Sequence, residues 1–153
     1  MQMNKLSIIL PSFNEPNIKQ VENDCKELFP SAEVIVVNDR KGLGKGWAVR
    51  KGIKKAKGDL IAYIDGDGDI FVGELFKLLR YIKEYDIVIG IKEHKKMPFK
   101  RAVVSAGYRF LIRLLFKLPV VDSQTGIKLF HRDTIPEFMT NGFAFVINSS
   151  IVS

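Results

Sequence analysis

Short apolar runs alternate with longer segments of helical periodicity through the first part of this chain. The apolar runs are residues 6–11, 33–37, 59–65 and 86–89, and each is bounded by turn-forming residues, as strands are. Apolar residues recur at helical spacing in residues 15–29, in residues 73–84 and in the stretch that contains Val49, Ile53 and Ala56. This alternation predicts an α/β fold with a mostly parallel sheet and helices on both faces.

Polar residues follow three of the predicted strands. Asn14, Asp39 and Asp65 each come just after an apolar run. In open α/β sheets, ligands bind beyond the carboxyl ends of the strands. The sequence therefore predicts a ligand site at this edge of the sheet.

The pattern changes after Lys92, where a basic loop precedes a long predicted helix at residues 99–118. Further strands are predicted at residues 126–130 and 143–147. Basic residues recur at multiples of four along the helix and form one stripe, with Ser105 between them: Arg101, Arg109, Arg113 and Lys117. Such a helix suits a membrane interface, where the basic groups bind lipid phosphates. The alternative is a core-packed helix with a solvated basic face.

Composition and charge narrow the class of protein. A chain of 153 residues with 46% hydrophobic content predicts one folded domain, residues 1–153. The net charge of +7 attracts anionic partners: nucleic acid, anionic lipid or a phosphorylated substrate. Cys25 is the only cysteine, which excludes an internal disulfide framework and fits the cytoplasm. No apolar stretch reaches the length of a spanning helix, so we expect a soluble or peripheral protein.

Asp65, Asp67 and Asp69 form an acidic loop directly after a predicted buried strand. Carboxylates this close favour a hard divalent cation, Mg²⁺ or Mn²⁺, which oxygen ligands bind together with substrate phosphates. A calcium-binding EF-hand is excluded, because Ile70 and Phe76 stand where that loop requires glycine and glutamate. The alternative is a solvated Asp/Gly turn between strand and helix.

A glycine-rich loop at residues 41–46 precedes the basic amphipathic helix. It lacks the Gly-Lys-Ser/Thr ending of a Walker A motif, and Trp47 stands where a Rossmann fingerprint needs glycine. What remains is a turn whose amide groups, with Lys41 or Lys45, bind a phosphate. The alternative is a plain turn.

Taken in order, the motifs resemble those of one family. Residues 8–15 end in Pro-Ser-Phe-Asn-Glu, residues 36–39 read Val-Val-Asn-Asp, and Gly42-Leu-Gly and Asp65-Gly-Asp follow. Further matches are Gly90 with Lys92, Arg101 with Ser105, and residues 122–130, where Lys128 replaces an arginine. This series resembles family 2 glycosyltransferases of the GT-A fold, particularly the dolichyl-phosphate mannose synthase and polyprenyl-phosphate glycosyltransferase branch.

The resemblance implies a metal-dependent, inverting transfer of a sugar from a UDP- or GDP-linked donor to an acceptor such as a polyprenyl phosphate. It implies catalytic roles for Asp65, Asp67, Lys92, Arg101 and Lys128, and metal ligation by Asp65, Asp67 and Asp69. It implies donor and cofactor binding by Pro11, Phe13, Asn14, Glu15, Asp39, Gly42, Lys45, Asp65 and Ser105. Residues 92–153 then form the acceptor-side portion, in peripheral contact with the inner face of the membrane.

The nucleotide-binding half is shorter than the family pattern. Only Arg40 and Lys41 separate Asp39 from Gly42, where the family has a further helix and strand, so the preference for uridine or guanosine stays open. A protein that binds nucleotide sugars without turnover is therefore an alternative. A nucleic-acid-binding module is disfavoured, because few aromatic residues interleave with the basic stripe.

Overall fold

The computed structural model describes residues 5–90 and 126–134, and the structural statements below concern these residues. They form β1 (Leu6–Ser12), α1 (Ile18–Leu28), β2 (Glu33–Asn38), α2 (Lys45–Lys55), β3 (Leu60–Ile64), η1 (Val72–Glu74), α3 (Leu75–Tyr81), β4 (Ile87–Ile89), β5 (Ile127–His131) and η2 (Arg132–Thr134). The strands and helices expected in this part of the chain are thus confirmed, with boundaries displaced by a few residues.

The strands join into one sheet in the order β2-β1-β3-β5-β4. β1 pairs in parallel with β2 and with β3, whereas β5 runs antiparallel to both β3 and β4. The mostly parallel sheet is confirmed, with β5 as its antiparallel member. β5 comes from a distant part of the sequence and separates β3 from β4, which are neighbours in chain order.

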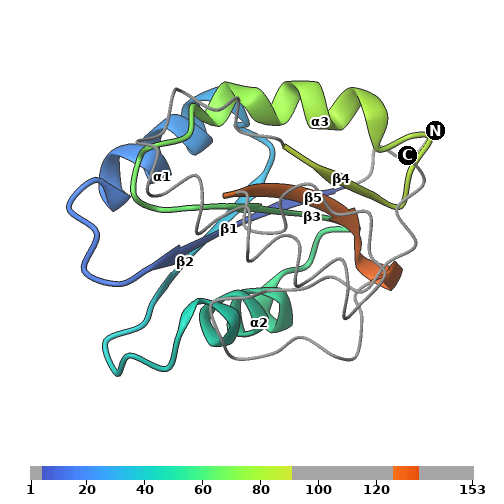
Figure 1. Ribbon diagram of the computed structural model, residues 1–153. Helices are drawn as coiled ribbons and strands as arrows, with labels where there is room; N and C mark the ends of the chain where they lie inside the picture. Colours follow the sequence, from blue (N-terminus) through green and yellow to red (C-terminus); the bar gives the residue numbers. More distant parts are fainter. Residues whose placement is uncertain (1–4, 91–125, 135–153) are drawn as a thin grey trace, which may run out of the picture.

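Helices cover both faces of the sheet, as Figure 1 shows: α1 and α3 lie on one face and α2 on the other. Under α1 and α3, the larger core contains Val21, Cys25 and Leu75 packed against the strands. Under α2, a smaller core joins Val49 and Ile53 to sheet residues that include Tyr63. The three-layer arrangement follows from apolar helix faces that must be removed from water.

α2 lies very close to the sheet because a glycine faces it. A Cβ atom at Gly52 would collide with the side chain of Ile9, which is fully buried in β1. The buried face of α2 also contains Gly46 and Ala48, while Lys51, Lys54 and Lys55 are exposed to solvent. This close approach places the amino-terminal end of α2 next to the carboxyl ends of the central strands.

Several predicted elements lie outside the described residues. These are the helix at residues 99–118, the strand at residues 143–147, and the three candidate residues Lys92, Arg101 and Ser105. Within residues 5–90 and 126–134, no helix has the length and hydropathy needed to cross a bilayer.

Candidate functional site

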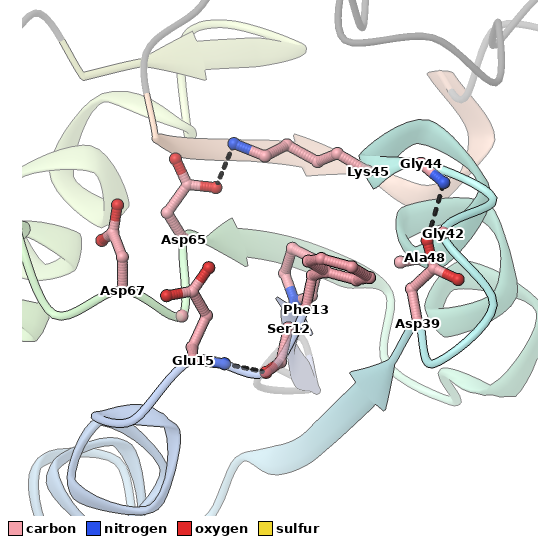
Figure 2. A pocket seen from close by; sticks show the side chains of 12 residues that line it. Ser12, Phe13, Glu15, Asp39, Gly42, Gly44, Lys45, Ala48, Asp65 and Asp67 are labelled. Atoms are coloured by element: carbon pink, nitrogen blue, oxygen red, sulfur yellow. Dashed lines mark hydrogen bonds and ion pairs between the residues drawn. The ribbon is translucent and has the colours of Figure 1, made fainter.

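A cavity of about 410 Å³ opens at the carboxyl ends of β1, β2 and β3, where the sequence predicts a ligand site. It is lined by Pro11, Ser12, Phe13, Glu15, Asp39, Gly42, Gly44, Lys45, Ala48, Asp65, Gly66 and Asp67. The end of β1, the glycine-rich loop and the acidic loop therefore meet around one space (Figure 2). Most of the predicted donor-binding residues within the described part of the chain are in this lining.

Asp39 lies at the glycine-rich side of the cavity and is almost completely buried. Its Oδ2 atom accepts a hydrogen bond from the backbone N–H of Gly44 at 2.7 Å. Gly42 and Gly44 both have positive φ, at 68° and 98°, which lets the loop fold back over the carboxylate. Asp39, Gly42 and Gly44 therefore form one turn, in which the two glycines allow the loop to bind the Asp39 carboxylate.

Two opposing effects set the protonation of Asp39. Burial disfavours its charged form, but the backbone N–H groups of the glycine-rich loop outweigh burial and hold the pKa of Asp39 below its usual range. Asp39 is thus an anion at neutral pH. Its Oδ1 atom is buried and accepts no hydrogen bond within the described residues. A buried acceptor in this state is able to take a hydrogen bond from an N–H or O–H group of a ligand in the cavity.

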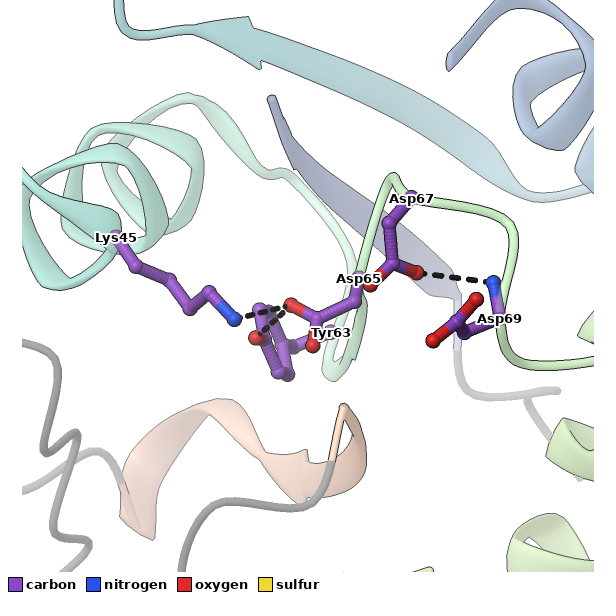
Figure 3. Close-up of polar contacts among 5 residues, drawn as sticks. All are labelled: Lys45, Tyr63, Asp65, Asp67 and Asp69. Carbon is purple, nitrogen blue, oxygen red and sulfur yellow. Dashed lines mark hydrogen bonds and ion pairs between the residues drawn. The ribbon is translucent and has the colours of Figure 1, made fainter. Parts of the chain in front are cut away.

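Asp65 lies at the opposite side of the cavity, at the end of β3. Its Oδ1 atom is 2.8 Å from the Nζ atom of Lys45, and it also accepts a hydrogen bond from the hydroxyl of Tyr63. Figure 3 shows both groups directed at the same oxygen. Burial, followed by the charge of Asp65 and this hydrogen bond, raises the pKa of Tyr63, so the hydroxyl keeps its proton and remains a donor.

Asp67 and Asp69 differ in their relation to the cavity. Asp67 is part of the lining, and its Oδ1 atom accepts a hydrogen bond from the backbone N–H of Asp69 at 2.9 Å. The Nδ2 atom of Asn17 donates a hydrogen bond to the Asp67 carbonyl at 2.9 Å, which ties the acidic loop to the start of α1. Asp69 is not among the lining residues. The structure therefore brings two of the three predicted metal ligands into the cavity.

The donor set at this end fits a divalent cation only in part. Carboxylate oxygens of Asp65 and Asp67 are the hard ligands that Mg²⁺ and Mn²⁺ prefer, and the remaining positions of such ions are commonly filled by water and phosphate. Within residues 5–90 and 126–134, no three His, Cys, Asp or Glu side chains gather closely enough to hold a metal alone. In this part of the chain, Asp65 and Asp67 would leave further coordination positions of an ion to water or to oxygen atoms of a ligand.

The segment after β1 contributes side chains of different kinds. Phe13 lines the cavity with 57% of its surface exposed, so a flat apolar face is open to a ligand. Glu15 lies on the side of Asp65 and Asp67 (Figure 2), and its backbone N–H donates to Ser12 Oγ at 3.4 Å. Asn14 adopts a positive φ of 53°, is exposed and is not in the lining. Its backbone conformation shapes the turn that precedes α1.

Lys128, predicted as a catalytic cation, is only 2% exposed. It lies on β5 in register with Tyr63, and its Nζ atom is 5.9 Å from the centre of the Tyr63 ring. Lys128 is therefore buried beside Tyr63 and is not part of the cavity lining.

Two residues that sequence reasoning did not assign to the site support Asp65. Tyr63 donates to its carboxylate, as described, and alternation along β3 was the available signal, because residues two apart share one face of a strand. Gly126 accepts a hydrogen bond from the Asp65 backbone N–H at 2.8 Å. A Cβ atom at Gly126 would lie 2.5 Å from Asp65 Oδ2. The absence of a side chain at residue 126 thus leaves room for the Asp65 carboxylate.

Comparison with known proteins places this geometry in context. The family model described as glycosyl transferase family 2 matches residues 34–138, more than half of the chain. A dolichyl-phosphate beta-glucosyltransferase of Trichomonas vaginalis is 30% identical over 117 residues, covering 69% of this chain and 35% of that protein. The corresponding enzyme of Drosophila melanogaster is 31% identical over 187 residues, covering 90% of this chain and 57% of that protein.

The chain is short relative to these proteins. It spans 27–57% of the length of the first eight curated relatives. The alignment with the Drosophila protein extends over 187 residues, against 153 in the whole chain, so that protein contains residues that have no counterpart here.

Solved structures show the same fold at low sequence identity. Glucosyl-3-phosphoglycerate synthase from Mycobacterium tuberculosis, in complex with Mg²⁺ and uridine diphosphate, aligns with a TM-score of 0.68 and 18% identity. The alignment covers 86% of this chain and 58% of that one. Mannosyl-3-phosphoglycerate synthase from Rubrobacter xylanophilus gives a TM-score of 0.65 at 19% identity, over 86% and 55% of the two chains. The expected GT-A fold is thereby confirmed.

Proposed function

Because the chain belongs to glycosyl transferase family 2, we propose that it transfers a sugar from a nucleoside-diphosphate sugar to a polyprenyl phosphate. The observation that carries this proposal is the cavity itself. At one side it has a buried carboxylate oxygen of Asp39 that accepts no hydrogen bond from the described residues, and at the other two carboxylates with a lysine. The base of a nucleotide needs a hydrogen-bond acceptor, which Asp39 supplies. Its phosphates need positive charge, which Lys45 and a cation bound by Asp65 and Asp67 would supply at the other side.

The base and ribose bind at the glycine-rich side. Asp39 Oδ1 accepts an N–H group of the base, and the exposed ring of Phe13 stacks on the base plane. Uracil is the first base to test, since Mycobacterium tuberculosis glucosyl-3-phosphoglycerate synthase has been solved with uridine diphosphate and with uridine-diphosphate-glucose. Guanine is the alternative to be included in the same assay.

The diphosphate binds at the acidic side, next to Lys45. Asp65 and Asp67 would hold a Mg²⁺ or Mn²⁺ ion, which supplies positive charge to the leaving diphosphate when bound. Mycobacterium tuberculosis glucosyl-3-phosphoglycerate synthase, which has the same fold, has been solved with Mn²⁺ and with Mg²⁺ together with uridine diphosphate. The role proposed for Asp65 and Asp67 is therefore to bind, through their negative charge, the divalent cation that accompanies the donor.

The acceptor oxygen attacks the anomeric carbon in line with the leaving group. The new carbon–oxygen bond forms as the bond to the diphosphate breaks, so the configuration at that carbon inverts. A phosphate acceptor is already anionic near neutral pH and needs cations for positioning, not a strong general base. The candidates for this task are Lys92, Arg101 and Ser105. Lys128 is buried and would contribute its positive charge through its position next to Tyr63.

A polyprenyl phosphate is proposed because the relatives named dolichyl-phosphate beta-glucosyltransferase align over most of this chain. Such an acceptor has its phosphate at a membrane surface. The basic stripe of residues 99–118 is suited to that surface, and contact there would be peripheral, at the cytoplasmic face.

The test is a release assay with a panel of UDP- and GDP-linked sugars and Mn²⁺ or Mg²⁺, with and without polyprenyl phosphate in detergent. We expect acceptor-dependent release of a nucleoside diphosphate and its loss in Asp67→Ala. Asp24→Ala removes a partly exposed carboxylate of α1 that does not line the cavity, and is the matched control with retained activity.

Two results would contradict the transferase. Donor binding without release under any acceptor condition would favour a nucleotide-sugar-binding protein, consistent with the residues that longer relatives have and this chain lacks. Failure to bind any nucleotide sugar would exclude both functions.

A further inference from the structure

The carboxylate that is proposed to hold the metal already has a cation of its own. Lys45 Nζ lies 2.8 Å from Asp65 Oδ1, with 37% of the Lys45 side chain and 16% of the Asp65 side chain exposed. The two residues come from different elements, since Lys45 begins α2 and Asp65 follows β3. Figure 2 shows the lysine extended from α2 to the acidic loop.

The hydroxyl of Tyr63 donates to the same oxygen, so Asp65 Oδ1 has two donors. Tyr63 is buried and comes from β3 itself, which fixes it in place. Lys45 is the more exposed partner and is attached through a flexible side chain, which makes it the group that moves. A divalent ion that approaches Oδ1 meets a positive charge at contact distance and must displace it.

We propose that Lys45 is the resident counter-ion of Asp65 in the donor-free protein, and that a divalent cation and the donor diphosphate displace it together. The metal takes the place of the ammonium group at Asp65, and the ammonium group turns to a diphosphate oxygen. This inference rests on the proposed function and adds to it the order and coupling of the binding events.

The coupling has a simple physical origin. Metal alone must remove the Lys45 ammonium group from its 2.8 Å contact with Asp65 and offers it no new partner in exchange. When a diphosphate is present, it supplies a new anionic partner for the lysine and further oxygen ligands for the metal. Each ligand therefore removes part of the cost of binding the other, and this coupling is reciprocal by thermodynamic linkage.

The experiment measures Mn²⁺ binding directly, from the electron paramagnetic resonance signal of free Mn²⁺, without turnover. Parent protein, Lys45→Met and Lys45→Gln are titrated with Mn²⁺ in the absence and presence of uridine diphosphate. Methionine keeps the apolar stem of the lysine and removes the charge, and glutamine provides a second variant should methionine destabilise the fold. Lys54→Met is the matched control, because it removes the same charge from an exposed position on α2.

In the parent protein, uridine diphosphate should strengthen Mn²⁺ binding. In Lys45→Met and Lys45→Gln, Mn²⁺ alone should bind about fivefold more tightly, the factor that corresponds to about 1 kcal/mol for a partly exposed ion pair. The strengthening by uridine diphosphate should shrink in both variants, because no lysine remains to be displaced. Lys54→Met should resemble the parent.

The outcomes separate this inference from the proposed function. Unchanged or weaker binding of Mn²⁺ alone in both Lys45 variants, with joint binding of Mn²⁺ and uridine diphosphate intact in the parent, would overturn the inference only. The same gain in Lys54→Met would also overturn it, since the effect would then arise from net charge. No joint binding in the parent, with guanosine diphosphate giving the same result, would overturn the proposed function as well.

Discussion

Asp65 depends on contacts from three separate parts of the chain. Lys45 forms an ion pair with its carboxylate, and Tyr63 donates a hydrogen bond to it. The Gly126 carbonyl accepts a hydrogen bond from its backbone N–H. Each contact fixes a different feature of the residue: its charge balance, the orientation of its carboxylate and the position of its backbone. The chemistry at this carboxylate is therefore set as much by its neighbours as by its own identity.

The first prediction at the residue scale concerns Gly126. In Gly126→Ala, the new methyl group would lie 2.5 Å from Asp65 Oδ2 and from Ile70 Cδ1, so both side chains must move. We expect a loss of about 1–3 kcal/mol in the free energy of unfolding, as for other overpacked sites. Displacing the carboxylate that we propose as a metal ligand should weaken joint binding of Mn²⁺ and uridine diphosphate by about 10–100-fold. Chemical denaturation and calorimetric titration measure the two effects.

A double variant distinguishes the two consequences. Gly126→Ala combined with Ile70→Val removes the Cδ1 methyl group that would collide, while the collision with Asp65 remains. Stability should recover in part and ligand affinity should not. Parent-like affinity in Gly126→Ala would show that residue 126 does not position Asp65.

The second prediction concerns the pH dependence of stability at Asp39. Because its pKa is depressed in the folded protein, the ionised form stabilises the fold at pH values above its ordinary pKa, and this contribution disappears as pH falls through the folded value. Asp39→Asn should therefore be less stable than the parent at pH 7. The difference should shrink from about pH 4 downward. Urea unfolding between pH 7 and pH 3 checks this, and a difference that grows on acidification would contradict it.

At the scale of elements, the position of α2 links the fold to the site. α2 packs tightly on the sheet through Gly52 and carries Gly44 and Lys45 at its amino-terminal end. Its other end is held by Arg132, whose Nη2 atom donates to the carbonyl of Ala56, the residue that caps α2. A shift of α2 away from the sheet would therefore change the glycine-rich loop and the lysine at the same time.

Gly52→Ala tests this link. The methyl group would collide with Ile9, and overpacking of about 1–3 kcal/mol exceeds the helix-propensity gain of up to about 1 kcal/mol from alanine. We expect a net destabilisation of about 1–2 kcal/mol and weaker binding of uridine diphosphate with Mn²⁺. Lys55→Ala, at an exposed position of the same helix, should leave both quantities close to those of the parent. Equal stability of Gly52→Ala and the parent would mean that α2 has room to move.

At the scale of the whole molecule, ligand binding should increase the free energy of unfolding. A ligand at 100 times its dissociation constant adds about 2.7 kcal/mol to the free energy of unfolding. For a chain of this size, that corresponds to a rise of about 5–10 °C in melting temperature. We expect this rise with uridine diphosphate and Mn²⁺ together, and a smaller one when EDTA removes the metal. Equal shifts with and without metal would contradict metal-assisted donor binding.

The sequence was sufficient for the strands and helices of the described region and for most of the cavity lining. Apolar periodicity records which face of a segment is buried, and this is a local property of the chain. Polar residues after β1, β2 and β3 then had to meet, because parallel strands end at the same edge of a sheet. This reasoning predicted Asn14, Asp39 and Asp65 at that edge, and Asp39 and Asp65 line the cavity whereas Asn14 does not.

Only the tertiary structure decided which distant residues meet. Periodicity does not say that β5 lies between β3 and β4, yet this pairing brings Gly126 to Asp65 and buries Lys128 beside Tyr63. It also does not show that Lys45 reaches Asp65, or that Asp69 stays outside the cavity lining. These contacts depend on strand order and on how closely a helix approaches the sheet, and both are settled by packing across the whole domain, not within one segment.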